Sequence, residues 1–105
     1  MRAGKLRHRV TIQRAVEAQN EFGEAVTTWV NVGQVWASVE PLRGREYFQA
    51  DGTQAEVSTV IRMRYRDGIV AKMRLVHGDD SYDIESVIDV GGRGRELELM
   101  CRLLI

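Results

Sequence analysis

The chain is poor in several residue types that would point to particular classes of protein. Cys101 is its one cysteine, so an internal disulfide is impossible, which suits a reducing compartment. No apolar run approaches the length that spans a membrane, and the N-terminus lacks the apolar stretch of a signal peptide. The 15 basic and 15 acidic residues cancel, which argues against a protein that binds nucleic acid over its whole surface.

Residues suited to catalysis or metal binding are also scarce. His8 and His77 lie far apart in the sequence, without the spacing of a metal site, and we interpret them as a solvated strand residue and a turn residue. Cys101 alternates with leucines and behaves there as a small hydrophobic residue. The pair Asp79-Asp80 and the glycine-rich run at 91–94 are interpreted as turns. We therefore predict no catalytic residues, no bound metal and no cofactor.

What the chain does have is alternation of apolar and polar residues with period two, which is typical of strands with one face on a core. The four alternating segments are His8–Arg14, Val57–Arg66, Ser81–Val90 and Glu96–Leu104. Two further strands are expected at Glu24–Val32 and at Gln34–Pro41, the second ended by its proline, and Met73–His77 is a short additional one. At 105 residues the chain is expected to form one domain.

These patterns predict an all-β fold: a six- to seven-stranded antiparallel β-barrel or sandwich with one insertion. The alternation places Tyr65, Ile88 and Val90 on the core face, and Val60 and Met100 on the opposite face. Turn signals between the expected strands lie at 20–23, 67–68, 77–80 and 91–94.

One stretch, Arg43–Ala55, breaks the alternation. It contains the dipeptide Asp51-Gly52, which is typical of a chain stop. We expect either one short helix or a long loop here, and such insertions in small β domains are usually functional.

Charged residues form two rows on the expected strands. Arg62, Arg64 and Arg66 share one strand face, and an acidic row follows on the strand Ser81–Val90. If the two strands pair, the rows form an exposed ladder of weak ion pairs. If they lie on different sides, complementary flanks favour head-to-tail association of identical subunits.

A basic cluster occupies the N-terminal segment 1–7, which we expect to be a flexible arm. Its candidate contact residues, with the strand residue that follows, are Lys5, Arg7 and Arg9. They suit either DNA phosphates or an acidic neighbouring subunit. The neighbour is favoured because the chain has no basic excess.

Four stretches carry a resemblance to a known family: Gly4–Gln13, Val35–Leu42 followed by Gly44-Arg45-Glu46, Arg62–Tyr65 and Tyr82–Val87. In order and spacing, from Gly4 to about Cys101, the chain resembles the phage head–tail adaptor family, also described as head–tail joining or head closure proteins. The residues that match its signature are Trp36, Glu40, Pro41, Arg64 and Tyr65.

The resemblance implies a small β-barrel with a long internal loop or helix and a structural, non-enzymatic role at the virion neck. It implies a homo-oligomeric ring beneath the portal and adaptor rings that closes the channel, retains the DNA without binding it specifically, and receives the tail or tail-terminator proteins. It implies synthesis in the cytoplasm of the bacterial host and no contact with a membrane. The candidate ring and channel interface is then Arg43, Gly44, Arg45, Glu46, Tyr47, Phe48 and Asp51.

Within that resemblance, Trp36 and Pro41 are interpreted as shape-setting, and Arg45 with Glu46 as candidates for contact between subunits. The chain departs from the family at its end, where it stops on Leu103-Leu104-Ile105 instead of polar residues.

A second class of function remains open, a small nucleic-acid-binding β-barrel. Such a barrel needs stacking aromatics on a basic strand face. Here Trp29, Trp36, Phe48 and Tyr82 are scattered, and Tyr65 is expected to point inward from the arginines. An enzyme is the third class, for which the sequence offers no reactive cluster.

Overall fold

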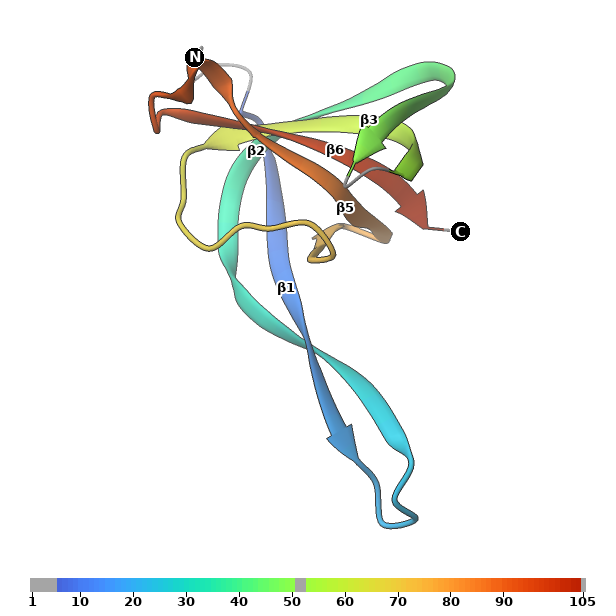
Figure 1. Ribbon diagram of the computed structural model, residues 1–105. Coiled ribbons are helices and arrows are strands. Elements are labelled where there is room, and N and C mark those ends of the chain that lie inside the picture. The colour runs from blue at the N-terminus through green and yellow to red at the C-terminus, as the bar shows by residue number, and fades with distance from the viewer. Residues whose placement is uncertain (1–5, 51–52, 105) are drawn as a thin grey trace.

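A computed structural model describes residues 6–50 and 53–104; for residues 43–50 and 53–56 it describes the course of the backbone. Its strands close into an antiparallel barrel in the order β1-β2-β3-β6-β5-β4 (Figure 1). The expected all-β antiparallel barrel is confirmed. A short 3-10 turn, Val90–Gly92, precedes β6. The strands are β1 (His8–Gln19), β2 (Ala25–Ala50), β3 (Thr53–Arg64), β4 (Arg74–His77), β5 (Asp80–Asp89) and β6 (Glu96–Leu104).

The barrel interior is filled by the apolar members of the alternating segments, because each strand turns every second side chain inward. Ile12, Ile61 and Leu99 are fully buried and belong to one cluster with residues of every strand. Cys101 is part of this cluster, as its alternation with leucines predicts. Each fully buried aliphatic side chain contributes about 1.5–3 kcal/mol.

Three inward predictions are wrong, for two structural reasons. The pairing of β5 with β6 shifts register between Ile84 and Ser86. An extra residue reverses which side chains face inward beyond it, so Ile88 and Val90 are exposed. Tyr65 follows the end of β3, outside the barrel wall, and is 43% exposed.

Two outward predictions are also wrong. Val60 and Met100 are buried and form a second cluster with Val57. Leu42 packs against this cluster from β2, so the outer face of β3 and β6 is covered at this one place. A strand segment carries apolar residues on both faces when other parts of the protein pack against both of them.

The two strands expected at Glu24–Val32 and Gln34–Pro41 are one continuous strand of 26 residues. The β1–β2 pairing shifts register opposite Ile12/Gln13, where β2 carries an extra residue. The β2–β3 pairing shifts between Pro41 and Glu46, and an irregular position of this kind tolerates a residue without a backbone N–H. A straight strand of this length would measure about 85 Å, yet the longest dimension of the molecule is 49 Å, so β2 bends strongly.

At one end of β2, the chain pairs with an extension of β1 that the sequence did not predict. Gln13 to Gln19 pair with Ala25 to Asn31 in reverse order. Figure 1 shows this ribbon leaving the barrel and ending in a turn far from it. We call residues 13–31 the arm.

At the other end, β2 continues into a hairpin with β3. Residues 46–50 pair with residues 53–57, so the expectation of a helix or loop at Arg43–Ala55 is wrong. Alternation is missing from this segment because it extends past the barrel core. A hairpin was indicated by Asp51-Gly52, which lies outside the described residues, since this dipeptide is typical of two-residue hairpin connections. We call residues 43–57 the second hairpin.

Candidate functional site

Three of the five signature residues meet on one surface of the barrel. Trp36, Arg64 and Tyr65, from β2 and the end of β3, line an open groove of about 710 Å³. Trp36 is 53% exposed, which is unusual for so large an apolar side chain. We call this surface the groove. Its remaining lining residues are Leu6, Val35 and Arg66.

Arginines surround the two exposed aromatic rings of the groove. Arg9 lies opposite Trp36 on β1, with its guanidinium carbon 5.2 Å from the centre of the ring. The guanidinium of Arg66 rests over Gly33, within 2.9 Å of where a Cβ would lie. Neither these two arginines nor Arg64 forms an ion pair with any carboxylate of the described side chains.

One carboxylate does lie near the groove. The hydroxyl of Tyr65 donates a hydrogen bond of 2.6 Å to Asp67, and this bond raises the pKa of Tyr65. Asp67 is one carboxylate beside three arginines, Arg9, Arg64 and Arg66, so the surface keeps a net positive charge. The groove is therefore aromatic and basic, which suits an apolar group accompanied by negative charge.

The other two signature residues lie elsewhere. Glu40 forms an ion pair with Arg62 across the β2–β3 pair, and Arg62 also contacts Glu98 of β6 at 3.2 Å. The hydrogen bond to Glu40 raises the pKa of Arg62. Pro41 aligns with Thr59 beside the register shift of β2. These residues shape the barrel wall rather than the groove.

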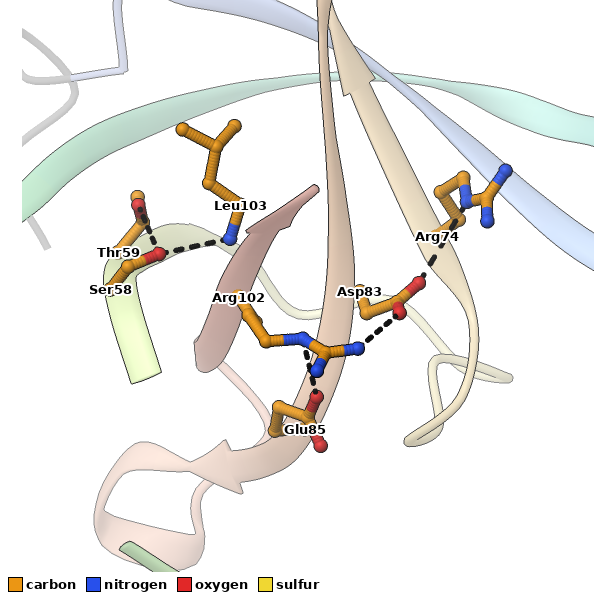
Figure 2. Close-up of polar contacts among 7 residues, drawn as sticks. All are labelled: Ser58, Thr59, Arg74, Asp83, Glu85, Arg102 and Leu103. Atoms are coloured by element: carbon orange, nitrogen blue, oxygen red, sulfur yellow. Dashed lines mark hydrogen bonds and ion pairs between the residues drawn. The ribbon is translucent and has the colours of Figure 1, made fainter. Parts of the chain in front are cut away.

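A second charge network crosses β4, β5 and β6 (Figure 2). Arg102 donates a hydrogen bond to Asp83 at 3.2 Å and lies 3.6 Å from Glu85. Arg74 approaches Asp83 from the other side at 3.8 Å. β6 lies between β3 and β5, so neither interpretation of the two charge rows holds as stated. β3 and β5 do not pair, and neighbouring strands neutralise Arg62 of one row and Asp83 and Glu85 of the other.

The base of the arm is fixed to the barrel by Arg74. Its guanidinium carbon lies 3.9 Å from the centre of the Trp29 ring, and its Nε is buried without a hydrogen bond to any described residue. Gln13 donates a hydrogen bond of 2.9 Å to Asn31 across the same end of the ribbon. The arm therefore leaves the barrel from an anchored base.

The tip of the arm is an organised turn that no functional argument from the sequence singled out. The side-chain oxygen of Asn20 accepts hydrogen bonds from the backbone N–H groups of Phe22, at 2.9 Å, and Glu24, at 3.0 Å. Gly23 has a φ of 78°, a conformation that favours glycine. Phe22 is 76% exposed on this turn. The signal in the sequence was the turn motif at 20–23, with an aromatic residue inside it.

The two histidines prove to be neighbours. The rings of His8 and His77 meet edge to face with centroids 4.7 Å apart, and both residues are half-buried, so the interpretation as separate solvated residues is wrong. Among the described side chains, no group of three or more His, Cys, Asp or Glu is placed to hold a metal ion. Burial raises the pKa of the Cys101 thiol and keeps it protonated.

Several candidate residues are not placed by the structure. Lys5 and Asp51 lie outside the described residues, and the side chains of residues 43–48 are not described. Arg7 is exposed just before β1. In the described parts of the chain, no helix is long and apolar enough to cross a membrane.

Comparison with known proteins gives consistent matches along the chain. Residues 1–104 match the family model described as phage head completion protein. Head completion protein gp7 of Enterobacteria phage HK97 is 26% identical over 97% of this chain and 96% of its own. Head completion protein gp16 of Bacillus phage SPP1 is 32% identical over 65% of this chain and 62% of its own.

Solved structures share the fold over nearly the whole chain. Protein SF1141 of Shigella flexneri 2a superposes with a TM-score of 0.70 at 30% identity, covering 97% of this chain and 96% of its own. A chain of the virion of a native gene transfer agent particle superposes with a TM-score of 0.68 at 17% identity, covering 95% of this chain and 96% of its own.

Proposed function

Because this chain belongs to the phage head completion protein family, we propose that it is a structural, non-enzymatic subunit of the neck of a tailed phage or prophage particle. Copies of the chain form a ring that joins the DNA-filled head to the tail. The subunit is made in the cytoplasm of the bacterial host and acts in the virion. The whole-length match to the family model is the observation that carries this proposal.

The shape of the subunit supports a ring component. A closed barrel leaves no free strand edge in its wall, so contacts with other subunits depend on what projects from the wall. Two hairpins project, the arm and the second hairpin. In a ring, one can contact neighbouring copies while the other points into the channel or toward an adjoining ring.

We assign the channel role to the second hairpin, which contains the candidate residues Arg43 to Phe48 and Asp51. Arg45 and Glu46 are proposed contacts between subunits. A hairpin ordered by pairing between strands is a compact element that can block a channel and move aside as a unit. A carboxylate such as Asp51 on a lumen-facing segment would repel DNA phosphates and keep the genome from adhering.

The remaining partners follow from the same position in the particle. Above the ring we place the portal and adaptor rings, and below it the tail or tail-terminator proteins. The N-terminal residues Lys5, Arg7 and Arg9 are proposed contacts with an adjoining acidic surface, and packaged DNA passes the ring without specific contacts.

Genetic removal of the chain tests the role in the neck. Particles lacking it are expected to package DNA, lose it, and fail to acquire tails, as seen by electron microscopy and by nuclease sensitivity of the genome. Particles that lack the chain but hold their DNA and join tails normally would contradict the proposal. A variant that shortens the second hairpin tests the gate: it should join tails yet leak DNA.

A nucleic-acid-binding β-barrel is the second candidate, and one observation favours it. Trp36 and Tyr65 are exposed beside unpaired arginines, as a base-stacking surface requires. A binding titration with single-stranded DNA over a range of salt separates the two functions, since true binding falls steeply as salt rises.

A further inference from the structure

The arm and the groove have complementary surfaces although they lie on different parts of the subunit. Between Ala15 and Thr28, the arm carries three glutamates and no basic residue. All three glutamates, Glu17, Glu21 and Glu24, are exposed. The groove has arginines and two exposed aromatic rings. A chain with no net charge thus separates its charges onto two distinct surfaces.

The arm also offers an apolar group of the right kind. Phe22 is the most exposed large apolar side chain among the described residues, at 76%. The hydrogen bonds of Asn20 hold the turn that presents it. A rigid aromatic side chain on an organised turn loses little conformational freedom on binding, which is typical of an anchor residue.

A subunit cannot place its own Phe22 in its own groove. Ten steps along the chain separate Gly23 at the tip from Gly33, over which the guanidinium of Arg66 rests, and at about 3.3 Å per residue this is roughly 30 Å of extended chain. Pairing with β1 along most of this length and the contact of Arg74 with Trp29 hold the ribbon away from the barrel. The complementary surfaces therefore meet only between two molecules.

We infer that the tip of the arm of one subunit, with Phe22 as its anchor, docks in the groove of the next copy of the same chain. Phe22 packs between the rings of Trp36 and Tyr65, and the tip glutamates face the groove arginines. The contact joins two different surfaces, so each subunit uses its arm on one neighbour and its groove on the other. This inference rests on the proposed ring, because a head-to-tail contact that closes on itself generates one.

The strength expected for the contact is modest. Burying one phenylalanine side chain changes an association constant by roughly 10- to 100-fold. The glutamates and arginines are exposed, so they affect the association rate and its salt dependence more than the affinity. A single contact of this kind is weak between free subunits and becomes effective when many copies are held together in a particle.

Mixing two defective variants tests whether the contact is head-to-tail. Phe22→Ala disables the arm, and Trp36→Ala disables the groove; both side chains are exposed, so both variants should fold with unchanged thermal unfolding. Each variant alone should self-associate 10- to 100-fold more weakly by sedimentation velocity at high protein concentration. An equimolar mixture should give a one-to-one dimer that grows no further, because one intact arm meets one intact groove. Val70→Ala, at another exposed apolar residue, is the matched control and should associate as the unchanged chain does.

Cross-linking tests the same contact independently of its strength. A double variant, Phe22→Cys with Tyr65→Cys, should yield a ladder of disulfide-linked oligomers under mild oxidation, in solution and in purified particles. Phe22→Cys with Val70→Cys should yield none, and Cys101 does not interfere because it is fully buried. The absence of a ladder in particles that contain the chain overturns the inference.

The outcomes separate this inference from the proposed function. Phe22→Ala particles that retain DNA and self-associate normally would overturn the docking of the arm, while the neck role would stand. Groove variants that fail while arm variants assemble normally would show that the groove holds another partner, such as nucleic acid, and would also overturn it. Particles that do not need the chain at all would instead refute the proposed function.

Discussion

The arm should be dispensable for folding. Ala15 and Trp29 are cross-strand partners, so residues 16–28 can be replaced by Asn-Gly, a dipeptide suited to a two-residue hairpin turn. The shortened chain keeps Trp29 and its contact with Arg74. None of the removed side chains belongs to either buried cluster.

Because no core side chain is removed, the shortened chain should lose little stability. Changes to exposed side chains away from special features alter the free energy of unfolding by about 0.5 kcal/mol, and we expect less than about 1 kcal/mol for the whole replacement. For a domain of about 100 residues, 1 kcal/mol shifts the midpoint of thermal unfolding by roughly 4–8 °C. The shortened chain should therefore unfold within about 8 °C of the full chain, as measured by circular dichroism.

A core variant supplies the comparison. Leu99 is fully buried on β6, and Leu99→Ala should cost about 2–5 kcal/mol and lower the midpoint by roughly 10–30 °C. If shortening the arm lowers it by a similar amount, the arm is part of the folding unit and its assignment as an assembly element fails. If the midpoint holds while complementation of head completion is lost, the two roles are separate, as the structure indicates.

Four further tests concern the barrel and the groove. Because burial raises the pKa of the Cys101 thiol, the native chain should not react with a thiol reagent at pH 8 and should react once denatured. The folded state also binds this proton more tightly than the unfolded state. The contribution of Cys101 to the free energy of unfolding should therefore be constant below pH 9, near the ordinary thiol pKa of 9.0, and should fall as pH rises further; Cys101→Val should remove that part of the fall. Arg62→Met should cost less than about 1 kcal/mol in urea unfolding because both of its ion pairs are at least partly exposed to solvent. Arg64→Met, which loses no ion pair among the described side chains, should cost nothing measurable. Gly33→Ala should displace the flexible guanidinium of Arg66 and lower the free energy of unfolding by less than about 1 kcal/mol. The displaced charge should weaken self-association. Unchanged association would show that Arg66 takes no part in the groove's function.

The sequence predicted the barrel because its core strands follow a simple rule. Wherever a strand has one face on the core, as from Val10 to Ile12 or from Leu97 to Leu99, alternation identifies both the strand and its inward face. The errors lie where that rule stops applying. The register shift after Ile84 reverses the faces of β5, and a single extra residue leaves no mark in the pattern.

The projecting hairpins were missed for a related reason. Apart from Val16, the stretch Ala15–Gln19 is composed of residues with weak strand propensity, and it is a strand because it pairs with Ala25–Trp29 across the turn. The groove was recognised only as scattered signature residues. Trp36 and Arg64 come from different strands, and no spacing along the chain indicates that β2 and β3 bring them together with Tyr65.

The length of β2 has a mechanical consequence. One uninterrupted strand runs from the base of the turn at the arm tip, through the barrel wall, to the end of the second hairpin. A pull on the arm by a neighbouring molecule is therefore transmitted by covalent backbone to the opposite projection, without passing through side-chain packing. The strand is irregular at two positions, where its pairing with β1 and with β3 shifts register. Those positions are where we expect β2 to bend, so that tension on the arm changes the angle between the second hairpin and the barrel.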